Sequence, residues 1–124
     1  MHTCHDVDKS NNGLYQPGHG VHADESYHDI RALAPPFAVY RDERSQAPWR
    51  YDGDTFWTYE DPVSVRFKAS YAAHEKLAGV MIGELSGDTD DAELLNVAYR
   101  SLHHPLGASI FAEERTGKPA AADH

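Results

Sequence analysis

The chain has 124 residues, of which 20 are Asp or Glu and 11 are Lys or Arg, giving a formal net charge of −9 at pH 7. This acidic balance argues against nucleic acid as a partner, because it repels a phosphate backbone and the basic residues are scattered. No apolar run approaches the roughly 20 residues of a membrane-spanning helix, and the single cysteine, Cys4, excludes an internal disulfide.

The first 26 residues are rich in Asn, Gly, His and Asp and show no hydrophobic period, which predicts a loop. Within it we expect residues 1–10 to be a disordered N-terminus. They have neither the basic region nor the apolar core of a signal peptide, so the export signal of a secreted parent would lie outside this chain. Tyr27, Ile30 and Leu33 fall three apart and predict a short helical turn.

Three short aromatic and β-branched runs follow, and they predict a small antiparallel sheet. An Asp-Gly step at Asp52-Gly53 separates the second run from the third and favours a hairpin. Strand alternation places Trp57 and Tyr59 on one face. The predicted strands are Phe37–Tyr40, Ala47–Tyr51 and Thr55–Tyr59.

Asp61-Pro62 predicts the start of a helix, because Asp is a preferred N-cap and proline fits the first helical position. Its expected apolar face carries Val63, Phe67 and Tyr71, and Gly79 is the expected stop.

The continuous apolar run at 79–84 predicts a fully buried parallel strand. Asp90 followed by Glu93 predicts the next helix at 91–102. Residues 103–124 are expected to be a flexible tail. One parallel strand between two helices cannot form a sheet alone, so the fold predicted from these elements is incomplete.

Two separated stretches resemble bacterial chitinases of glycoside hydrolase family 18. The first is Asn12-Gly13-Leu14-Tyr15-Gln16-Pro17. The second runs from Thr55 to Asp88 and includes Tyr59-Glu60-Asp61-Pro62 and Gly79-Val80-Met81-Ile82-Gly83-Glu84-Leu85-Ser86-Gly87-Asp88.

The resemblance covers roughly residues 11 to 102 and implies a mixed α+β and α/β fold. This would be the C-terminal fragment of a (β/α)8 TIM barrel with a small antiparallel insertion domain. Residues 11–60 would be that insertion, and 61–102 the final helix-strand-helix, with the eighth strand at 79–84. A whole barrel takes about 250 residues. The start at Met1, where the family's seventh strand should have ended, supports truncation.

The family hydrolyses β-1,4-linked N-acetylglucosamine polymers with an acid motif, D-x-x-D-x-D-x-E, while the acetamide of the substrate acts as nucleophile. No Asp of this sequence heads that pattern: Asp88 has Asp91 at the first offset but lacks the final Glu. We therefore assign no catalytic residue. Gly83 stands where the family usually has a tryptophan that stacks on the sugar ring.

Four residues are candidate substrate contacts: Trp49, Trp57, Gly83 and Glu84. The two tryptophans, with Tyr59, would form an aromatic wall, or else the core of the small sheet. Glu84 would hydrogen-bond sugar hydroxyls at the C-terminal end of a barrel strand, or else be a solvated carboxylate.

We expect no metal and no cofactor. His2, Cys4, His5 and Asp6 lie close together, but no second ligand pair stands at a matching distance. The segment that begins at Asp6 does not match a calcium-binding loop, because Pro17 occupies the position at which such a loop requires Glu.

The sequence therefore indicates a chitinase-like glycoside hydrolase that is inactive as this chain, with chitin or chito-oligosaccharide as partner. The alternative is a non-catalytic carbohydrate-binding module. A third possibility is an unstable fragment that self-associates through the exposed edges of the strand at 79–84. Members of the family are typically secreted.

Overall fold

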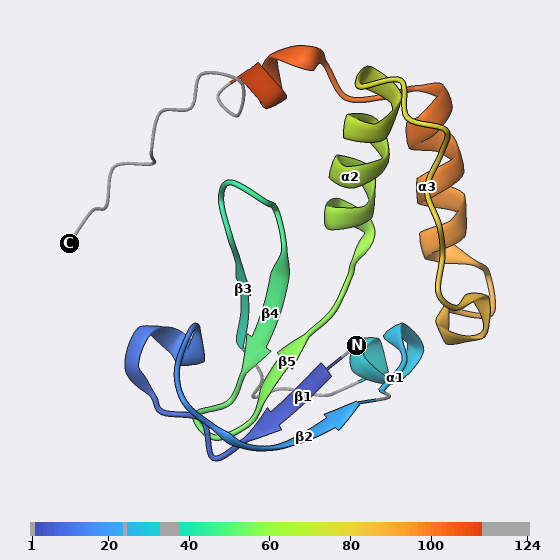
Figure 1. Ribbon diagram of the computed structural model, residues 1–124. Coiled ribbons are helices and arrows are strands. Elements are labelled where there is room, and N and C mark those ends of the chain that lie inside the picture. Colours follow the sequence, from blue (N-terminus) through green and yellow to red (C-terminus); the bar gives the residue numbers. More distant parts are fainter. Residues whose placement is uncertain (1, 24, 33–37, 113–124) are drawn as a thin grey trace.

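The computed structural model describes residues 2–23, 25–32 and 38–112. An antiparallel sheet with one short helix on its face is followed by two packed helices (Figure 1). The strands are β1 (His2–His5), β2 (His19–Ala23), β3 (Ala38–Arg41), β4 (Pro48–Tyr51) and β5 (Phe56–Thr58). The helices are α1 (Tyr27–Ala32), α2 (Pro62–His74) and α3 (Glu93–His103), and the 3-10 turns are η1 (Ser10–Gly13), η2 (Leu85–Gly87) and η3 (Ala108–Phe111).

The sheet has five strands in the order β2-β1-β5-β4-β3, and every neighbouring pair is antiparallel. The three strands predicted from the aromatic runs are confirmed as β3, β4 and β5. The prediction that residues 1–10 are disordered was wrong. Strand β1 lies inside the sheet, with His2 opposite Thr58 and Cys4 opposite Phe56. Its side chains are too polar to show a strand pattern, and its backbone pairs with nearby β2 on one side and with β5, about fifty residues later, on the other.

The loop between β1 and β2 is attached to one face of the sheet. The hydroxyl of Tyr51 donates to the carbonyl of Val7 over 2.6 Å, and the amide of Val7 donates to the carbonyl of Asp54 over 2.8 Å. Gly13 ends η1 at φ 77°, and a Cβ there would lie 2.9 Å from the ring of Tyr51 and 3.1 Å from that of Phe56. Only glycine allows this approach.

The opposite face of the sheet carries the main core. Trp57 and Tyr59 project from the β5 side and pack with Tyr27 and Ile30 of α1, and Leu94 of α3 closes the cluster. The predicted helical turn is confirmed as α1, although Leu33 lies outside the described residues, as does Phe37. The shared face predicted for Trp57 and Tyr59 is confirmed as well.

The predicted start of α2 is confirmed in detail. A carboxylate oxygen of Asp61 accepts from the Ser64 amide over 2.9 Å, while the Ser64 hydroxyl accepts from the Asp61 amide, also over 2.9 Å. This reciprocal capping box satisfies two amides that the helix leaves without partners. The helix ends at His74, five residues before the predicted stop at Gly79.

The predicted apolar face of α2 was partly wrong. Val63 is 47% exposed, and Phe67 and Tyr71 pack on Phe111 rather than on a barrel strand. The buried residues of α2 are instead small: Ser64, Ala69, Ser70 and Ala72. The buried residues of α3, Ala98 and Ser101, are small too. Small side chains let the axes of α2 and α3 approach closely.

The strand predicted at 79–84 was wrong. The segment is assigned to no strand, all its residues are exposed, and Met81 is 97% exposed. It runs alongside α3 (Figure 1). A strand needs a hydrogen-bonded neighbour, and within the described residues none lies beside this segment. An apolar run alone therefore did not determine a strand.

Two further predictions need correction. The start of α3 is held by Asp88, whose carboxylate accepts from the amides of Leu94 and Leu95, rather than by Asp90. The flexible tail predicted for 103–124 was wrong for residues 103–112, because Phe111 in η3 is only 1% exposed and Leu106 donates its amide to the Ser70 hydroxyl over 3.0 Å. Residues 113–124 lie outside the described part of the chain.

Candidate functional site

A groove of about 430 Å³ lies between the β1–β2 loop and the β3–β4 hairpin. We call it the sheet groove. Trp49 lines it from β4 and is half-buried. The residues that line it are His2, Leu14, Tyr15, Asp42, Ser45, Ala47, Pro48, Trp49, Phe56, Thr58, Tyr59 and Glu60.

Trp49 is held in place on two sides. Its indole stacks on Tyr40 with ring centroids 5.5 Å apart and planes inclined by 23°. Its Nε1 donates to the carbonyl of Asn12 over 3.2 Å. The indole therefore keeps a fixed orientation, and the surface that Tyr40 leaves uncovered is available to the groove. A flat aromatic face in a fixed position is suited to stacking against an apolar ring face.

Two carboxylates at the rim of the groove are also fixed. Asp42 accepts from the hydroxyl of Ser45 over 2.6 Å and from its amide over 2.7 Å, and these hydrogen bonds lower the pKa of Asp42. Glu60 accepts from the hydroxyl of Ser64 over 2.7 Å and forms an ion pair with Lys68. Both carboxylates can accept hydrogen bonds from ligand hydroxyl or amide groups.

The structure does not bring Trp57 to this groove. Trp57 is only 6% exposed and belongs to the core against α1, so the core alternative holds and its assignment as a substrate contact was wrong. The reason is strand alternation: Phe56 and Thr58 face the sheet groove, and Trp57 between them faces the other side.

Gly83 and Glu84 line a second groove of about 840 Å³, which we call the helix groove. It lies against α2 and α3 and is bounded by the exposed segment 80–84. A Cβ built at Gly83 would have no atom within 4 Å, so this position is open. The lining residues are Glu25, Ser26, Tyr27, Glu60, Val65, Lys68, Ala69, Val80, Met81, Ile82, Gly83, Glu84, Gly87, Asp88, Leu94 and Ala98.

Glu60 is the residue that lines both grooves. The predicted contacts are thus divided: Trp49 lies in the sheet groove, Gly83 and Glu84 lie in the helix groove, and Trp57 lies in the core. Sequence reasoning did not assign a role to Asp42, Ser45, Thr58, Glu60 or Tyr15. An Asp three residues before a Ser indicates a fixed turn carboxylate and could have identified Asp42.

Within the described residues, no group of three or more His, Cys, Asp or Glu side chains is placed to hold a metal ion. In the same part of the chain no helix is both long and apolar enough to cross a membrane. The sheet groove itself offers the aromatic face of Trp49 for stacking and the carboxylates of Asp42 and Glu60 for hydrogen bonding.

The model of one protein family, the glycosyl hydrolases family 18, matches residues 5–88. Among solved structures, a family 18 N-acetylglucosaminidase from Paenibacillus barengoltzii is 36% identical, with a TM-score of 0.71 over 82% of this chain. A cell-surface-expressed multi-modular chitinase from Paenibacillus sp. strain FPU-7 is 28% identical (TM-score 0.73, 85% of this chain). A chitinase from Bacillus thuringiensis is 26% identical (TM-score 0.69, 83%).

The chain spans 31%, 10% and 21% of the length of these three structures, respectively. No curated protein matches it.

Proposed function

Because the chain belongs to glycosyl hydrolase family 18, we propose that it binds chitin or chito-oligosaccharide through the sheet groove, as part of a protein that degrades β-1,4-linked N-acetylglucosamine polymers. The observation that carries this proposal is the fixed, half-buried indole of Trp49 beside the carboxylates of Asp42 and Glu60. A pyranose ring needs this combination of an aromatic face and polar acceptors, and the groove falls within the range of about 300–1,000 Å³ typical of small-ligand sites.

The names of the similar structures support the substrate class, since two are chitinases and one is an N-acetylglucosaminidase. One is expressed at the bacterial cell surface, which favours an extracellular site of action for the protein proposed here. In the TIM-barrel arrangement that the family implies, the sheet and α1 would form a wall of the substrate cleft. Glu84 would contribute a further acceptor from the helix groove.

We further propose that the 124-residue chain does not hydrolyse chitin by itself. Hydrolysis in this family needs a carboxylic acid that protonates the glycosidic oxygen. No Asp of the sequence heads the D-x-x-D-x-D-x-E pattern that supplies this acid. Binding without hydrolysis is therefore the function proposed for this chain, which is also what the carbohydrate-binding alternative expects.

The binding experiment uses the two tryptophans of the chain. Titration with chitotetraose is expected to change the fluorescence of the wild type, and this change should be lost in Trp49→Phe, which retains the buried Trp57. Calorimetric titration of Trp49→Ala should show a loss of affinity of about tenfold or more. Cellotetraose, which lacks the acetamide groups, serves as the matched ligand control. Equal binding of Trp49→Ala and wild type would contradict the proposal.

The hydrolysis experiment is separate. A fluorogenic chitobiose substrate is incubated with the purified chain and with a heat-treated sample. We expect equal signals. Turnover clearly above the heated control would show that a catalytic acid exists outside the family pattern, and the inactivity proposal would then fail while the binding proposal remained open to its own test.

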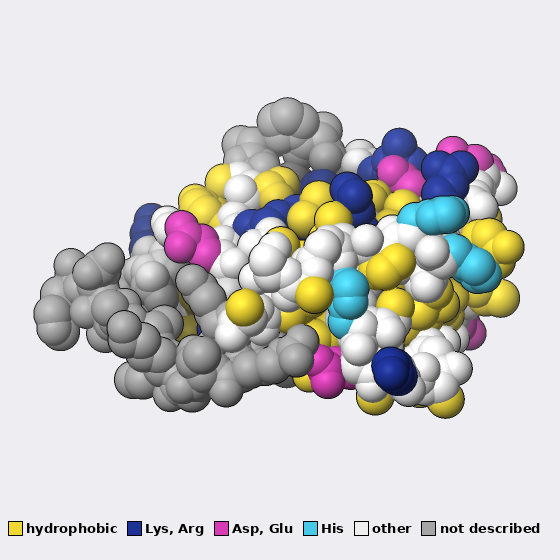
Figure 2. Space-filling view, turned by 90° about the horizontal axis from the view of Figure 1, so that it is seen from above, with side chains coloured by type: hydrophobic (Ala, Val, Ile, Leu, Met, Phe, Trp, Pro, Cys, Tyr) yellow, Lys and Arg dark blue, Asp and Glu magenta, His cyan; other side chains and the backbone are white. Residues whose placement is uncertain are grey.

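We also propose that the chain self-associates through the apolar segment around Met81. Apolar side chains reach the surface at the helical end of the molecule (Figure 2), and Leu77, Met81 and Leu85 are each more than half exposed. The backbone of segment 79–83 makes no hydrogen bond within the described residues. The unpaired N–H and C=O groups of this segment, beside exposed apolar side chains, would be free to pair with a second copy of the chain. In analytical ultracentrifugation, Met81→Lys should reduce the average molecular mass of the species in solution. Tyr15→Lys, at a similarly exposed site elsewhere, should leave that mass unchanged.

A further inference from the structure

Tyr15 is a bulky aromatic residue that is both exposed and held in a left-handed backbone conformation. Its side chain is 91% exposed, and its backbone is left-handed, with φ 60°. A bulky residue at positive φ is sterically unfavourable, and the exposed ring gains little from packing in return. Such strain persists where the surrounding structure imposes it, and it is concentrated at sites of function.

The surrounding structure that imposes this conformation is visible in the hydrogen bonds. The carbonyl of Leu14, which belongs to the peptide bond preceding Tyr15, accepts from two side-chain amides. Asn11 Nδ2 donates over 3.3 Å and Gln16 Nε2 donates over 3.2 Å. Together they fix the orientation of the peptide plane from which Tyr15 projects. The loop is also anchored three residues earlier, where Asn12 accepts from the indole of Trp49.

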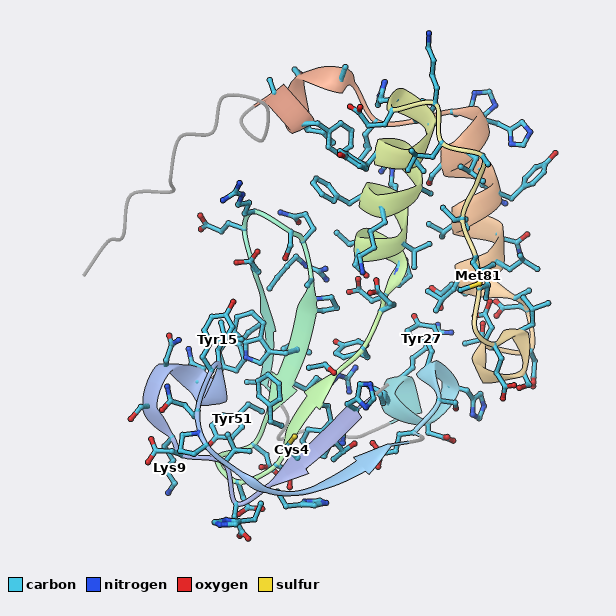
Figure 3. All side chains as sticks on the ribbon, in the orientation of Figure 1. Cys4, Lys9, Tyr15, Tyr27, Tyr51 and Met81 are labelled. Atoms are coloured by element: carbon cyan, nitrogen blue, oxygen red, sulfur yellow. The ribbon has the colours of Figure 1, made fainter. Side chains whose placement is uncertain are left out.

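The ring of Tyr15 lies at the sheet groove. Tyr15 lines it from the loop side, and Trp49 lines it from the strand side. Figure 3 shows Tyr15 between η1 and the β3–β4 hairpin. The hydroxyl of Tyr15 makes no hydrogen bond within the described residues, and the ring is 91% exposed, so it contributes little to the packing of the fold.

We propose that Tyr15 is a second sugar-stacking residue of the sheet groove, held ready by the amides of Asn11 and Gln16. The inference rests on the proposed binding of chito-oligosaccharide. Trp49 and Tyr15 approach the groove from different elements, so each contacts a different part of the bound oligosaccharide. Because the loop is already ordered, little conformational freedom is lost when the sugar binds. Asn11 and Gln16 act as positioning residues.

The test compares chitotetraose affinity and thermal stability in four variants of the full chain. Tyr15→Ala is expected to raise the Kd about tenfold with an unchanged melting midpoint, since a surface ring is removed. Tyr15→Phe should keep most of the affinity, because stacking uses the ring face. The pair Asn11→Ala with Gln16→Ala should lower affinity while the ring is still present. Tyr99→Ala is the matched control, because Tyr99 is 63% exposed on α3 and lines neither groove.

The outcomes separate the two proposals. If Trp49→Ala loses binding but Tyr15→Ala binds as the wild type does, the role of Tyr15 is refuted and the proposed function stands. If Tyr15→Ala melts at a clearly lower temperature, Tyr15 is a structural residue and the inference is wrong. If the wild type binds no chito-oligosaccharide, both proposals fail together.

Discussion

The hydroxyl of Tyr27 donates a hydrogen bond of 2.9 Å to Glu93, 66 residues later in the chain, and so joins α1 to the first turn of α3. Arg31 Nη1 lies 3.0 Å from the same carboxylate oxygen. Burial, and then the hydrogen bond to Glu93, raise the pKa of Tyr27 far above its ordinary value, so the phenol remains a donor. This contact connects the sheet with the pair of helices.

Replacing Tyr27 by Phe removes this donor and keeps the ring in the core. We expect the free energy of unfolding to fall by about 1 kcal/mol, which is typical of one hydrogen bond. Urea denaturation followed by circular dichroism measures it, with Tyr99→Phe as the control at an exposed site. A variant as stable as the wild type would mean that Arg31 alone satisfies Glu93.

Asp61 makes stability depend on pH. Burial acts to raise its pKa, but the hydrogen bonds from Arg41 and from the Ser64 amide outweigh burial and lower the pKa below the ordinary value of 3.8. A lowered folded pKa contributes stability above the unfolded pKa, and this contribution is lost as pH falls through the folded pKa.

Asp61→Asn keeps a side-chain oxygen that can cap α2 but removes the charge. Its free energy of unfolding should be lower than that of the wild type near neutral pH, and this difference should narrow as the pH falls through 3.8 and further toward the lowered pKa of Asp61. Asp61→Ala also loses the cap, at a further cost of about 1 kcal/mol. Asp90→Asn, at an exposed position, is the control. A gap that stays constant with pH would rule out the charge effect.

Gly13 is expected to tolerate no side chain. Gly13→Ala introduces a Cβ 2.9 Å from the ring of Tyr51 at a backbone φ of 77°. We expect a loss of about 2–4 kcal/mol from strain and overpacking together. Gly53→Ala isolates the backbone part, because φ there is 101° but the nearest atom is 3.9 Å away. Equal melting midpoints for the two variants would show that the ring contact has no cost.

Gly83→Trp tests the open position of the helix groove. A Cβ at Gly83 meets no atom within 4 Å, so the backbone position itself has room for a side chain, and we expect only a small change in stability. The substitution would add the aromatic face that the resemblance to family 18 predicts at this position, and on that prediction the affinity for chito-oligosaccharide should rise by about tenfold. Gly83→Ala adds a side chain without a ring and should have no effect. Unchanged affinity in both variants would separate the helix groove from sugar binding.

Local chemistry in the sequence predicted the parts of the fold that depend on neighbouring residues. The hairpin at Asp52-Gly53 and the cap at Asp61 follow from turn and helix-end preferences. Strand β1 could not be predicted, because its residues are too polar to show a strand pattern and its place inside the sheet depends on β5, about fifty positions away. The apolar run at 79–84 has a strand composition, but a strand also requires a partner that composition does not reveal.

The candidate site was predicted only in part for a similar reason. Strand alternation showed that Trp57 and Tyr59 share a face of the sheet. It could not show that α1 covers this face, nor that Trp49 lines the sheet groove. Tyr15 lay inside a motif used for the resemblance, and only its backbone conformation and exposure distinguish it.

The position of β1 has a kinetic consequence. In the sheet formed by the described residues, β1 and β5 are the one pair that joins the β1–β2 hairpin to the β3–β4–β5 meander. Each part can form early from near neighbours, but joining them must close a loop from residue 4 to residue 56, and such distant pairings are slow. During synthesis the N-terminal hairpin therefore has to wait, with one edge open, until β5 has emerged from the ribosome.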